Sequence, residues 1–150
     1  MPEPTLGNNI VVQVGIIVRD IETKTRAWSE ILGLPLPEIM ITDAYDKTQA
    51  EYQGAPTQAL CKLAFFHMGQ LDVELIEPIG APSTWQAHLD EKGEGLHHIA
   101  FQIKGMKERV AYLDSKGIPL LQRGEYEGGR YAYVDGMKQL GTVLELLEND

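Results

Sequence analysis

GLHHIAF, residues 95–101, sets a pattern that the rest of the chain repeats. Its residues alternate as in a half-buried strand, in which successive side chains point to opposite faces. The apolar face carries Ile99 and Phe101, and His97 is in phase with them. His98 is on the other face, which lacks large apolar residues, so it is the better candidate for lining a cavity. A single histidine on a strand is usually a structural residue, and its functional interpretation therefore depends on the rest of the chain.

Length and composition restrict the functional classes. At 150 residues, the chain can bury a sizeable core as one compact unit or as two small modules that share an interface. The formal net charge is -9 and the 13 basic residues are scattered, which argues against nucleic acid as a partner. An anionic membrane surface is disfavoured for the same reason.

The cysteine content and the N-terminal residues indicate a compartment. Cys61 has no second cysteine with which to form an internal disulfide, which fits a reducing cytosol. Residues 1–9 are polar and lack the basic start and apolar centre of a secretion signal. No stretch is apolar for long enough to span a bilayer. We therefore expect a cytoplasmic protein that does not interact with membranes.

The first half of the chain is expected to form a strand, a helix and three further strands. Asp20 caps the helix and Gly33 ends it. The polar residues 42–57 are interpreted as a long loop or irregular flap. A turn at Gly69 joins the last two strands into a hairpin that ends at Pro78. The four strands are predicted over residues 10–18, 36–41, 60–67 and 71–77.

The second half restarts the same pattern after a linker rich in Gly, Pro, Ser and charged residues. The linker includes a short predicted helix at residues 83–89. A second long helix begins near Met106 and ends at Gly117. Strands are predicted over residues 96–103, 120–122, 131–134 and 142–148.

The two halves can be superimposed without reference to any other protein. Gln13 aligns with His98 on the first strand of each half, and ELIE at residues 74–77 aligns with ELLE at residues 145–148. The chain is thus expected to be one domain, with module one at about residues 10–78, a linker at about 79–94 and module two at about 95–150. If the modules pack about a pseudo-twofold axis, four polar side chains converge on one point: Gln13, Glu74, His98 and Glu145.

This set of side chains predicts a metal site. A carboxylate within an apolar strand often faces water, but burying Glu74 or Glu145 in a curved sheet requires a cation or strong hydrogen-bond donors. Two carboxylates, one imidazole and one amide oxygen, without a thiolate, suit a divalent ion such as Co, Ni, Zn, Mn or Fe. Gln13 is the weakest ligand of the set, because a neutral amide oxygen binds metals less well than imidazole.

Three stretches of this sequence resemble the vicinal oxygen chelate superfamily, which includes glyoxalase I, methylmalonyl-CoA epimerase, extradiol dioxygenases and bleomycin-resistance proteins. They are GLHHIAF at residues 95–101, VELIEP at residues 73–78 and GTVLEL at residues 141–146. The resemblance covers nearly the whole chain. It implies an α+β fold in which two tandem βαβββ modules form a curved mixed sheet around a central cavity.

Within that superfamily, the sequence around His98 and the stretch FFHMG at residues 65–69 are most similar to methylmalonyl-CoA epimerase. The resemblance implies that Gln13, Glu74, His98 and Glu145 are the metal ligands. It also implies that Glu145 lies near the proton-transfer centre, with Glu51 as a loose match for a second acid-base glutamate. Epimerases have His where this chain has Gln13 and Gln where it has Glu74. The order Gln, Glu, His, Glu is instead found in glyoxalase I enzymes.

The resemblance implies a metal-dependent isomerase or epimerase that abstracts a proton alpha to a carbonyl of a small-molecule substrate, such as an acyl-CoA or other thioester. Glu145 and Glu51 are the expected catalytic residues, and a homodimer is the expected assembly. One alternative is a glyoxalase I-type lyase, a lactoylglutathione lyase. Another is a non-catalytic protein that binds a small molecule such as an antibiotic. Dioxygenase chemistry is disfavoured, because Gln13 removes a histidine from the two-histidine, one-carboxylate set it uses.

Overall fold

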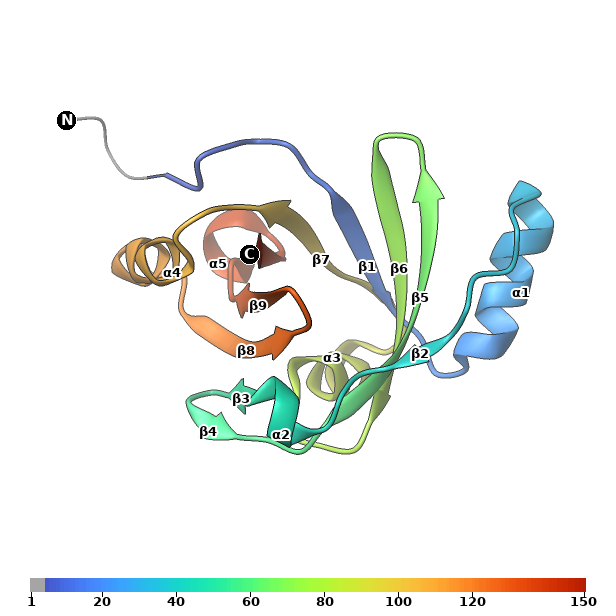
Figure 1. Ribbon diagram of the computed structural model, residues 1–150, viewed down its shortest axis with the longest axis horizontal. Coiled ribbons are helices and arrows are strands. Elements are labelled where there is room, and N and C mark those ends of the chain that lie inside the picture. The colour runs from blue at the N-terminus through green and yellow to red at the C-terminus, as the bar shows by residue number, and fades with distance from the viewer. Residues whose placement is uncertain (1–4) are drawn as a thin grey trace.

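The computed structural model of the protein describes residues 5–150 (Figure 1). The prediction that residues 1–9 contain no targeting signal falls partly on residues 1–4, which lie outside the described residues. None of the helices within residues 5–150 is long and apolar enough to cross a membrane.

Helices and strands follow the doubled order expected from the internal repeat. The first half contains β1 (Gln13–Ile17), α1 (Ile21–Leu32), β2 (Met40–Ile41), α2 (Tyr45–Thr48), β3 (Glu51–Tyr52), β4 (Ala55–Pro56), β5 (Leu60–Met68) and β6 (Leu71–Ile79). A connecting helix, α3 (Thr84–Lys92), leads to the second half. The second half contains β7 (Gly95–Gln102), α4 (Met106–Ser115), β8 (Leu120–Tyr126), β9 (Gly129–Val134), α5 (Met137–Leu140) and β10 (Val143–Asn149).

The strands of the described residues form one mixed sheet in the order β2-β5-β6-β1-β7-β10-β9-β8-β3-β4. Parallel pairing joins β1 to β6 in the first half and β10 to β7 in the second, and the halves meet where β1 and β7 pair antiparallel. Figure 1 shows the sheet curling from β5 and β6 through β1 and β7 to β9 and β8. The α+β class and the curved mixed sheet are therefore confirmed.

Each half has one long helix, α1 or α4, which covers the outer face of its strands. The side chain of Asp20 accepts a hydrogen bond from the Thr23 backbone N–H, and α1 ends at Gly33, whose φ of 67° suits glycine. Leu75 on β6 is buried beneath α1, and Leu146 on β10 is buried beneath α4. These two leucines occupy matching positions in the sequence repeat.

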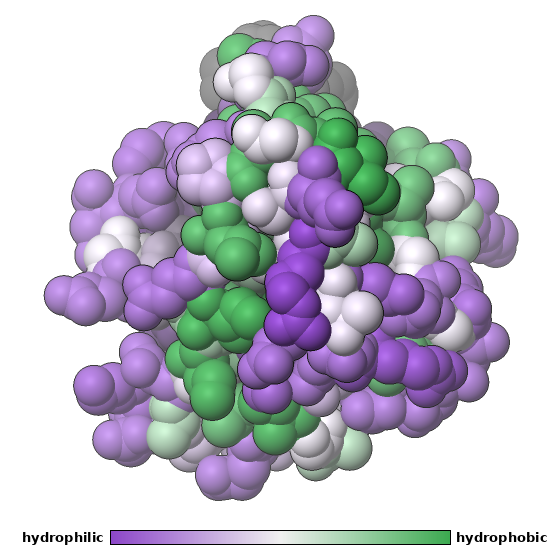
Figure 2. Space-filling model, turned by 90° about the vertical axis from the view of Figure 1, so that its right-hand side faces the viewer, coloured by the Kyte–Doolittle hydropathy of each residue, from purple (hydrophilic) through white to green (hydrophobic). Residues whose placement is uncertain are grey.

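A third buried cluster fills the inner side of the sheet beneath α3. Trp85 from α3 packs against Tyr133 from β9 with ring centroids 6.2 Å apart, and the first half contributes Ile17, Cys61 and Ile76. This cluster joins the two halves, since it draws side chains from both. In contrast to these buried residues, Ile31 and Leu32 at the C-terminal end of α1 are exposed. Figure 2 shows apolar patches among hydrophilic surface on that side of the molecule.

Several predicted boundaries were wrong. The strand expected over residues 36–41 shrinks to β2, and residues 42–57 form α2 and the small hairpin of β3 and β4 rather than an irregular loop. The β3 strand pairs with β8 of the second half. The last strand of the first half passes through Pro78 to Ile79, because Pro78 is tolerated opposite Cys61 near the end of the ladder.

The expected orientation of His97 was also wrong. Gly15 pairs with His98 but Ile16 pairs with Leu96, so His97 is an extra residue opposite β1. Such a β-bulge can redirect a side chain. The His97 and His98 rings lie 5.1 Å apart, and both contact the Tyr133 ring at centroid distances of 5.2 and 5.0 Å. Both histidines therefore face the inner side of the sheet.

Candidate metal centre

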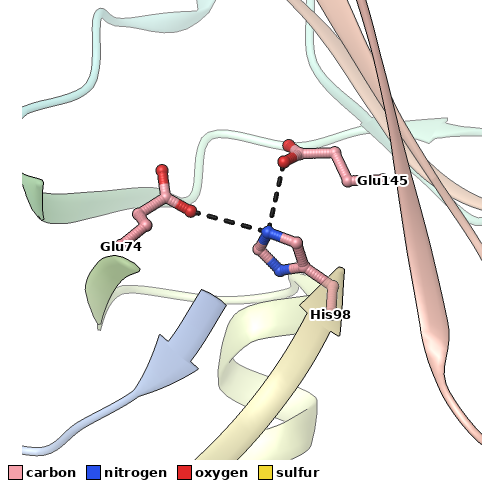
Figure 3. Close-up of side chains that lie close together, drawn as sticks. All are labelled: Glu74, His98 and Glu145. Carbon is pink, nitrogen blue, oxygen red and sulfur yellow. Dashed lines mark ion pairs between the residues drawn. The ribbon is translucent and has the colours of Figure 1, made fainter. Parts of the chain in front are cut away.

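Four polar side chains from the adjacent strands β6, β1, β7 and β10 converge on the inner side of the sheet. The Nε2 atom of His98 lies 2.9 Å from Gln13 Oε1, 3.2 Å from Glu145 Oε1 and 3.6 Å from Glu74 Oε1. Figure 3 shows both carboxylates directed at this ring nitrogen from different strands. All four residues are at least nine-tenths buried. The convergence that the internal repeat predicts is thus present in the structure.

Strand register explains why these residues meet. Gly15 pairs with both Glu74 and His98, whereas Ala100 pairs with both Gln13 and Glu145. Gly15, which has no side chain, and Ala100, which has only a methyl group, therefore lie beside these two pairs of polar residues at the join between the halves. At Gly15 even a methyl group is excluded, because an added Cβ would lie 2.1 Å from Cε1 of His98.

The charge of the cluster is incompletely balanced by the protein. Glu74 Oε1 is buried and has no hydrogen-bond partner among the described residues. Burial raises the pKa of the Glu74 carboxyl well above its usual range, and the charges of Glu145 and then Asp72 raise it further. A buried oxygen without a donor, next to a second carboxylate, is the environment that a bound cation would relieve.

The geometry satisfies the first requirement of a metal site. Glu74, His98 and Glu145 each offer one ligand atom, and these atoms lie within 4.8 Å of one another. Gln13 Oε1 lies beside the same imidazole nitrogen and could provide a fourth oxygen or nitrogen ligand. The residues present therefore fit a divalent ion of the kind that accepts carboxylate and imidazole ligands.

A second buried histidine, His97, contacts the ring of His98. The Nδ1 atoms of His97 and His98 lie 2.9 Å apart, and Nε2 of His97 lies 3.0 Å from Oγ1 of Thr84. Burial lowers the pKa of His97 well below its usual value, and the neighbouring His98 and His88 lower it further. His97 is therefore held neutral between the cluster and the first residue of α3.

A cavity of about 610 Å³ opens above the cluster. Its wall is mainly apolar and aromatic, with acidic residues among the lining. Phe65 and Leu63 contribute from β5, and Tyr131 and Tyr133 contribute from β9. Cys61 also lines it, and burial, followed by the charges of Glu74 and Glu145, raises the pKa of this thiol well above its usual value. The cavity has the size of a small-molecule site.

Glu51, which was expected as the second acid-base residue, lies on β3, next to the edge strand β4 of the sheet. Its carboxylate is 4.0 Å from Arg123 Nη1, and its side chain is 41% exposed. Among the described residues, Glu51 is outside the set that lines the cavity. Gln13, Glu74 and Glu145 all belong to that set.

Sequence reasoning missed two tyrosines and a threonine near the site. Tyr133 is buried, and its hydroxyl accepts a hydrogen bond from Trp85 Nε1 at 3.1 Å. The hydroxyl of Tyr131 accepts one from Gln122 Nε2 at 3.1 Å, and Gln122 Oε1 accepts one from the Thr84 N–H at 2.8 Å. The alternation of Tyr131 and Tyr133 on one strand could have indicated that they share a face. The role of Thr84 depends on tertiary contacts alone.

Comparisons with known proteins agree with this architecture. The profile of the Glyoxalase/Bleomycin resistance protein/Dioxygenase superfamily matches residues 12–134. A curated relative, YqjC of Bacillus subtilis (strain 168), is 29% identical over 143 residues, which cover 93% of this chain and 92% of the relative.

Two solved structures share the fold at low sequence identity. One is a methylmalonyl-CoA epimerase from Mycobacterium tuberculosis, with a TM-score of 0.66, 19% identity and coverage of 100% of this chain and 93% of the other. The second is a Streptomyces coelicolor methylmalonyl-CoA epimerase in complex with 2-nitronate-propionyl-CoA, with a TM-score of 0.64, 18% identity and coverage of 97% and 96%. At these identities the likeness concerns the fold.

Proposed function

Because this chain belongs to the Glyoxalase/Bleomycin resistance protein/Dioxygenase superfamily, we propose that it is a metal-dependent isomerase or epimerase that abstracts a proton alpha to a carbonyl. The observation that carries the proposal is the convergence of Glu74, His98 and Glu145 beneath a cavity of about 610 Å³. Isolated buried carboxylates are costly, so their placement in a cavity favours a role in binding or catalysis.

The proposed ligands are Gln13, Glu74, His98 and Glu145. The orphaned oxygen of Glu74 and the absence of a thiolate from this set favour a divalent ion, with Co, Ni, Zn, Mn and Fe as candidates. Such an ion, when bound, supplies a Lewis acid that stabilises negative charge on a substrate carbonyl oxygen. Gln13 then completes the ligand set as a neutral member, so that two carboxylates balance the charge of a divalent cation.

Glu145 is the proposed base that removes the alpha proton. Its carboxylate is buried, lines the cavity and lies 3.2 Å from His98 Nε2. A base in a cavity can hold the proton that it removes, and inversion of the centre requires a second acid to deliver a proton to the opposite face of the carbon. Glu51 is proposed as the second acid-base residue on the family resemblance alone, and its use requires release of its ion pair with Arg123.

An acyl-CoA or other thioester is the proposed substrate, with methylmalonyl-CoA as the first to test. The epimerase structures that share this fold support the choice, since one holds 2-nitronate-propionyl-CoA. Apolar residues such as Met40 and Phe65 suit an acyl chain. The described residues that line the cavity include carboxylates but neither lysine nor arginine, so the phosphates of CoA would have to lie outside it.

The direct test follows deuterium at C2 of methylmalonyl-CoA in heavy water. We expect metal-loaded wild type to incorporate deuterium, Glu145→Gln to lose at least about 100-fold in rate because the base is removed, and the surface control Glu38→Gln to match wild type. A folded, metal-loaded wild type that exchanges no deuterium would end the epimerase proposal.

A glyoxalase I-type lyase is the second candidate, and the residue at position 74 favours it. Epimerases have Gln where this chain has Glu74 and His where it has Gln13, whereas the order Gln13, Glu74, His98, Glu145 matches glyoxalase I. An ultraviolet assay with methylglyoxal and glutathione distinguishes the two reactions. Formation of the lactoyl thioester, together with no exchange at C2 of methylmalonyl-CoA, would favour the lyase.

We also propose that the protein is a cytoplasmic homodimer. The single buried cysteine, Cys61, is consistent with a reducing compartment. Multi-angle light scattering on the purified chain tests the assembly, and a mass of about twice 16.7 kDa is the expected result.

A further inference from the structure

The bulge in β7 gives His97, the first histidine of GLHHIAF, a position that regular strand pairing would not allow. His97 is an extra residue opposite β1; it is 3% exposed, and its ring lies on the same side of the sheet as that of His98. Bulges that redirect a side chain commonly occur beside active sites.

His97 forms the centre of a chain of three hydrogen-bonding groups. Nδ1 of His98 lies 2.9 Å from Nδ1 of His97, and Nε2 of His97 lies 3.0 Å from Thr84 Oγ1. Thr84 is itself fixed at the start of α3, where its backbone N–H donates to Gln122 Oε1 at 2.8 Å. All three residues are buried, so each hydrogen bond of this series joins two protein groups.

When both rings are neutral, this series of hydrogen bonds has only two possible donor-to-acceptor directions. In the first, the Thr84 hydroxyl donates to His97 Nε2, His97 Nδ1–H donates to His98 Nδ1, and His98 Nε2–H donates to Gln13 Oε1. In the second, His98 Nδ1–H donates to His97 Nδ1, and His97 Nε2–H donates to Thr84 Oγ1. Only the second leaves the His98 Nε2 lone pair free to bind a metal.

We propose that His97 and Thr84 are positioning residues that select the metal-binding tautomer of His98. The inference deepens the proposed function and rests on its metal site. The first direction belongs to the metal-free protein and the second to the loaded protein. On reversal, the proton of His97 Nδ1 passes to His98 Nδ1, the proton of His98 Nε2 leaves to solvent, and His97 Nε2 takes one from solvent. Both rings stay neutral, and the Thr84 hydroxyl keeps its proton and rotates.

Matched variants separate this role from simple packing. Thr84→Val removes the hydroxyl at nearly constant volume, whereas Thr84→Ser retains it. His97→Leu removes both ring nitrogens, whereas His97→Asn retains a carbonyl oxygen that can accept from His98 Nδ1–H. Circular dichroism and urea unfolding establish that each variant is folded before its zinc affinity is measured.

The experiment combines zinc titration with nitrogen-15 spectra of the imidazole rings. In zinc-loaded wild type we expect protonated Nδ1 on His98 and protonated Nε2 on His97, and the opposite tautomers after chelation. We expect His97→Leu to lose about 10- to 100-fold in zinc affinity, Thr84→Val to lose less, and His97→Asn and Thr84→Ser to recover most of it.

Unchanged zinc affinity in folded His97→Leu, or a deprotonated Nδ1 on His98 in the loaded wild type, would overturn the inference while leaving the proposed function intact. Zinc binding with the expected tautomers but without activity on any tested substrate would instead overturn the proposed function alone. A folded wild type that binds none of Co, Ni, Zn, Mn and Fe overturns both.

Discussion

The imidazole of His98 occupies the space that a side chain at Gly15 would fill. The two residues pair across β1 and β7, and a Cβ at Gly15 would lie 2.1 Å from Cε1, 2.5 Å from Nδ1 and 2.7 Å from Nε2 of that ring. Gly15 has no positive φ, so its value here is its lack of a side chain rather than its backbone freedom.

Replacing Gly15 tests this relationship. We expect Gly15→Ala to cost about 1–3 kcal/mol of unfolding free energy, because the methyl group must displace a packed ring. We also expect divalent-metal affinity to fall by at least about 10-fold, since His98 can no longer keep its orientation. Urea unfolding and metal titration measure the two effects.

Ala100→Gly is the matched control, because Ala100 aligns with Gly15 in the repeat and lies beside Gln13. It should cost about 0.5–1 kcal/mol through backbone entropy and leave metal affinity within about twofold. Metal affinity that is unchanged in folded Gly15→Ala would contradict the importance of this contact.

The buried carboxyl of Glu74 should make the unfolding free energy of the chelator-treated protein depend on pH. Its folded pKa lies well above the ordinary value of 4.5, so the folded state keeps a proton that the unfolded state releases. The stabilisation is complete below pH 4.5 and is lost as pH rises through the folded pKa, with a slope of up to about 1.4 kcal/mol per pH unit. Urea unfolding between about pH 5 and 8 measures it.

Glu74→Gln should abolish that part of the pH dependence and stabilise the metal-free protein at pH 8, because a neutral amide replaces a buried acid that must ionise or stay protonated. The exposed Glu38→Gln should leave the slope unchanged. An equal slope in wild type and Glu74→Gln would show that the buried carboxyl does not titrate as described.

The outer faces of the two halves should contribute equally to stability. Leu75 and Leu146 align in the repeat, and both are fully buried on the side of the sheet opposite to the candidate metal centre. We expect Leu75→Ala and Leu146→Ala each to cost about 2–5 kcal/mol, because each leaves a cavity under a helix. Zinc affinity of the folded fraction should not change. A loss below about 1 kcal/mol in either variant would contradict the packing described.

The internal repeat carried most of the information that the sequence held about this fold. Alternation predicted the long strands, because their buried and exposed faces differ, and Asp20 and Gly33 marked the ends of α1 through chemistry local to the chain. Aligning Gln13 with His98 predicted that the two would meet across the join between the halves, which is where the structure has them, 2.9 Å apart.

What the sequence could not predict depends on contacts between distant segments. Residues 51–52 form a strand by pairing with both β8 and β4, and nothing in two residues signals this. The reorientation of His97 follows from the register of β7 against β1, which a pattern within one strand cannot contain. Thr84 reaches His97 because α3 packs across the inner side of the sheet.

The metal content of the protein tests the central claim most directly. Wild type, His98→Ala and the control His67→Ala, whose side chain is 86% exposed, are loaded with cobalt, desalted and analysed for metal and protein. We predict about one ion per chain in wild type and in His67→Ala and almost none in folded His98→Ala. Full occupancy in His98→Ala, or no cobalt in wild type, would contradict the claim that Gln13, Glu74, His98 and Glu145 hold a divalent ion.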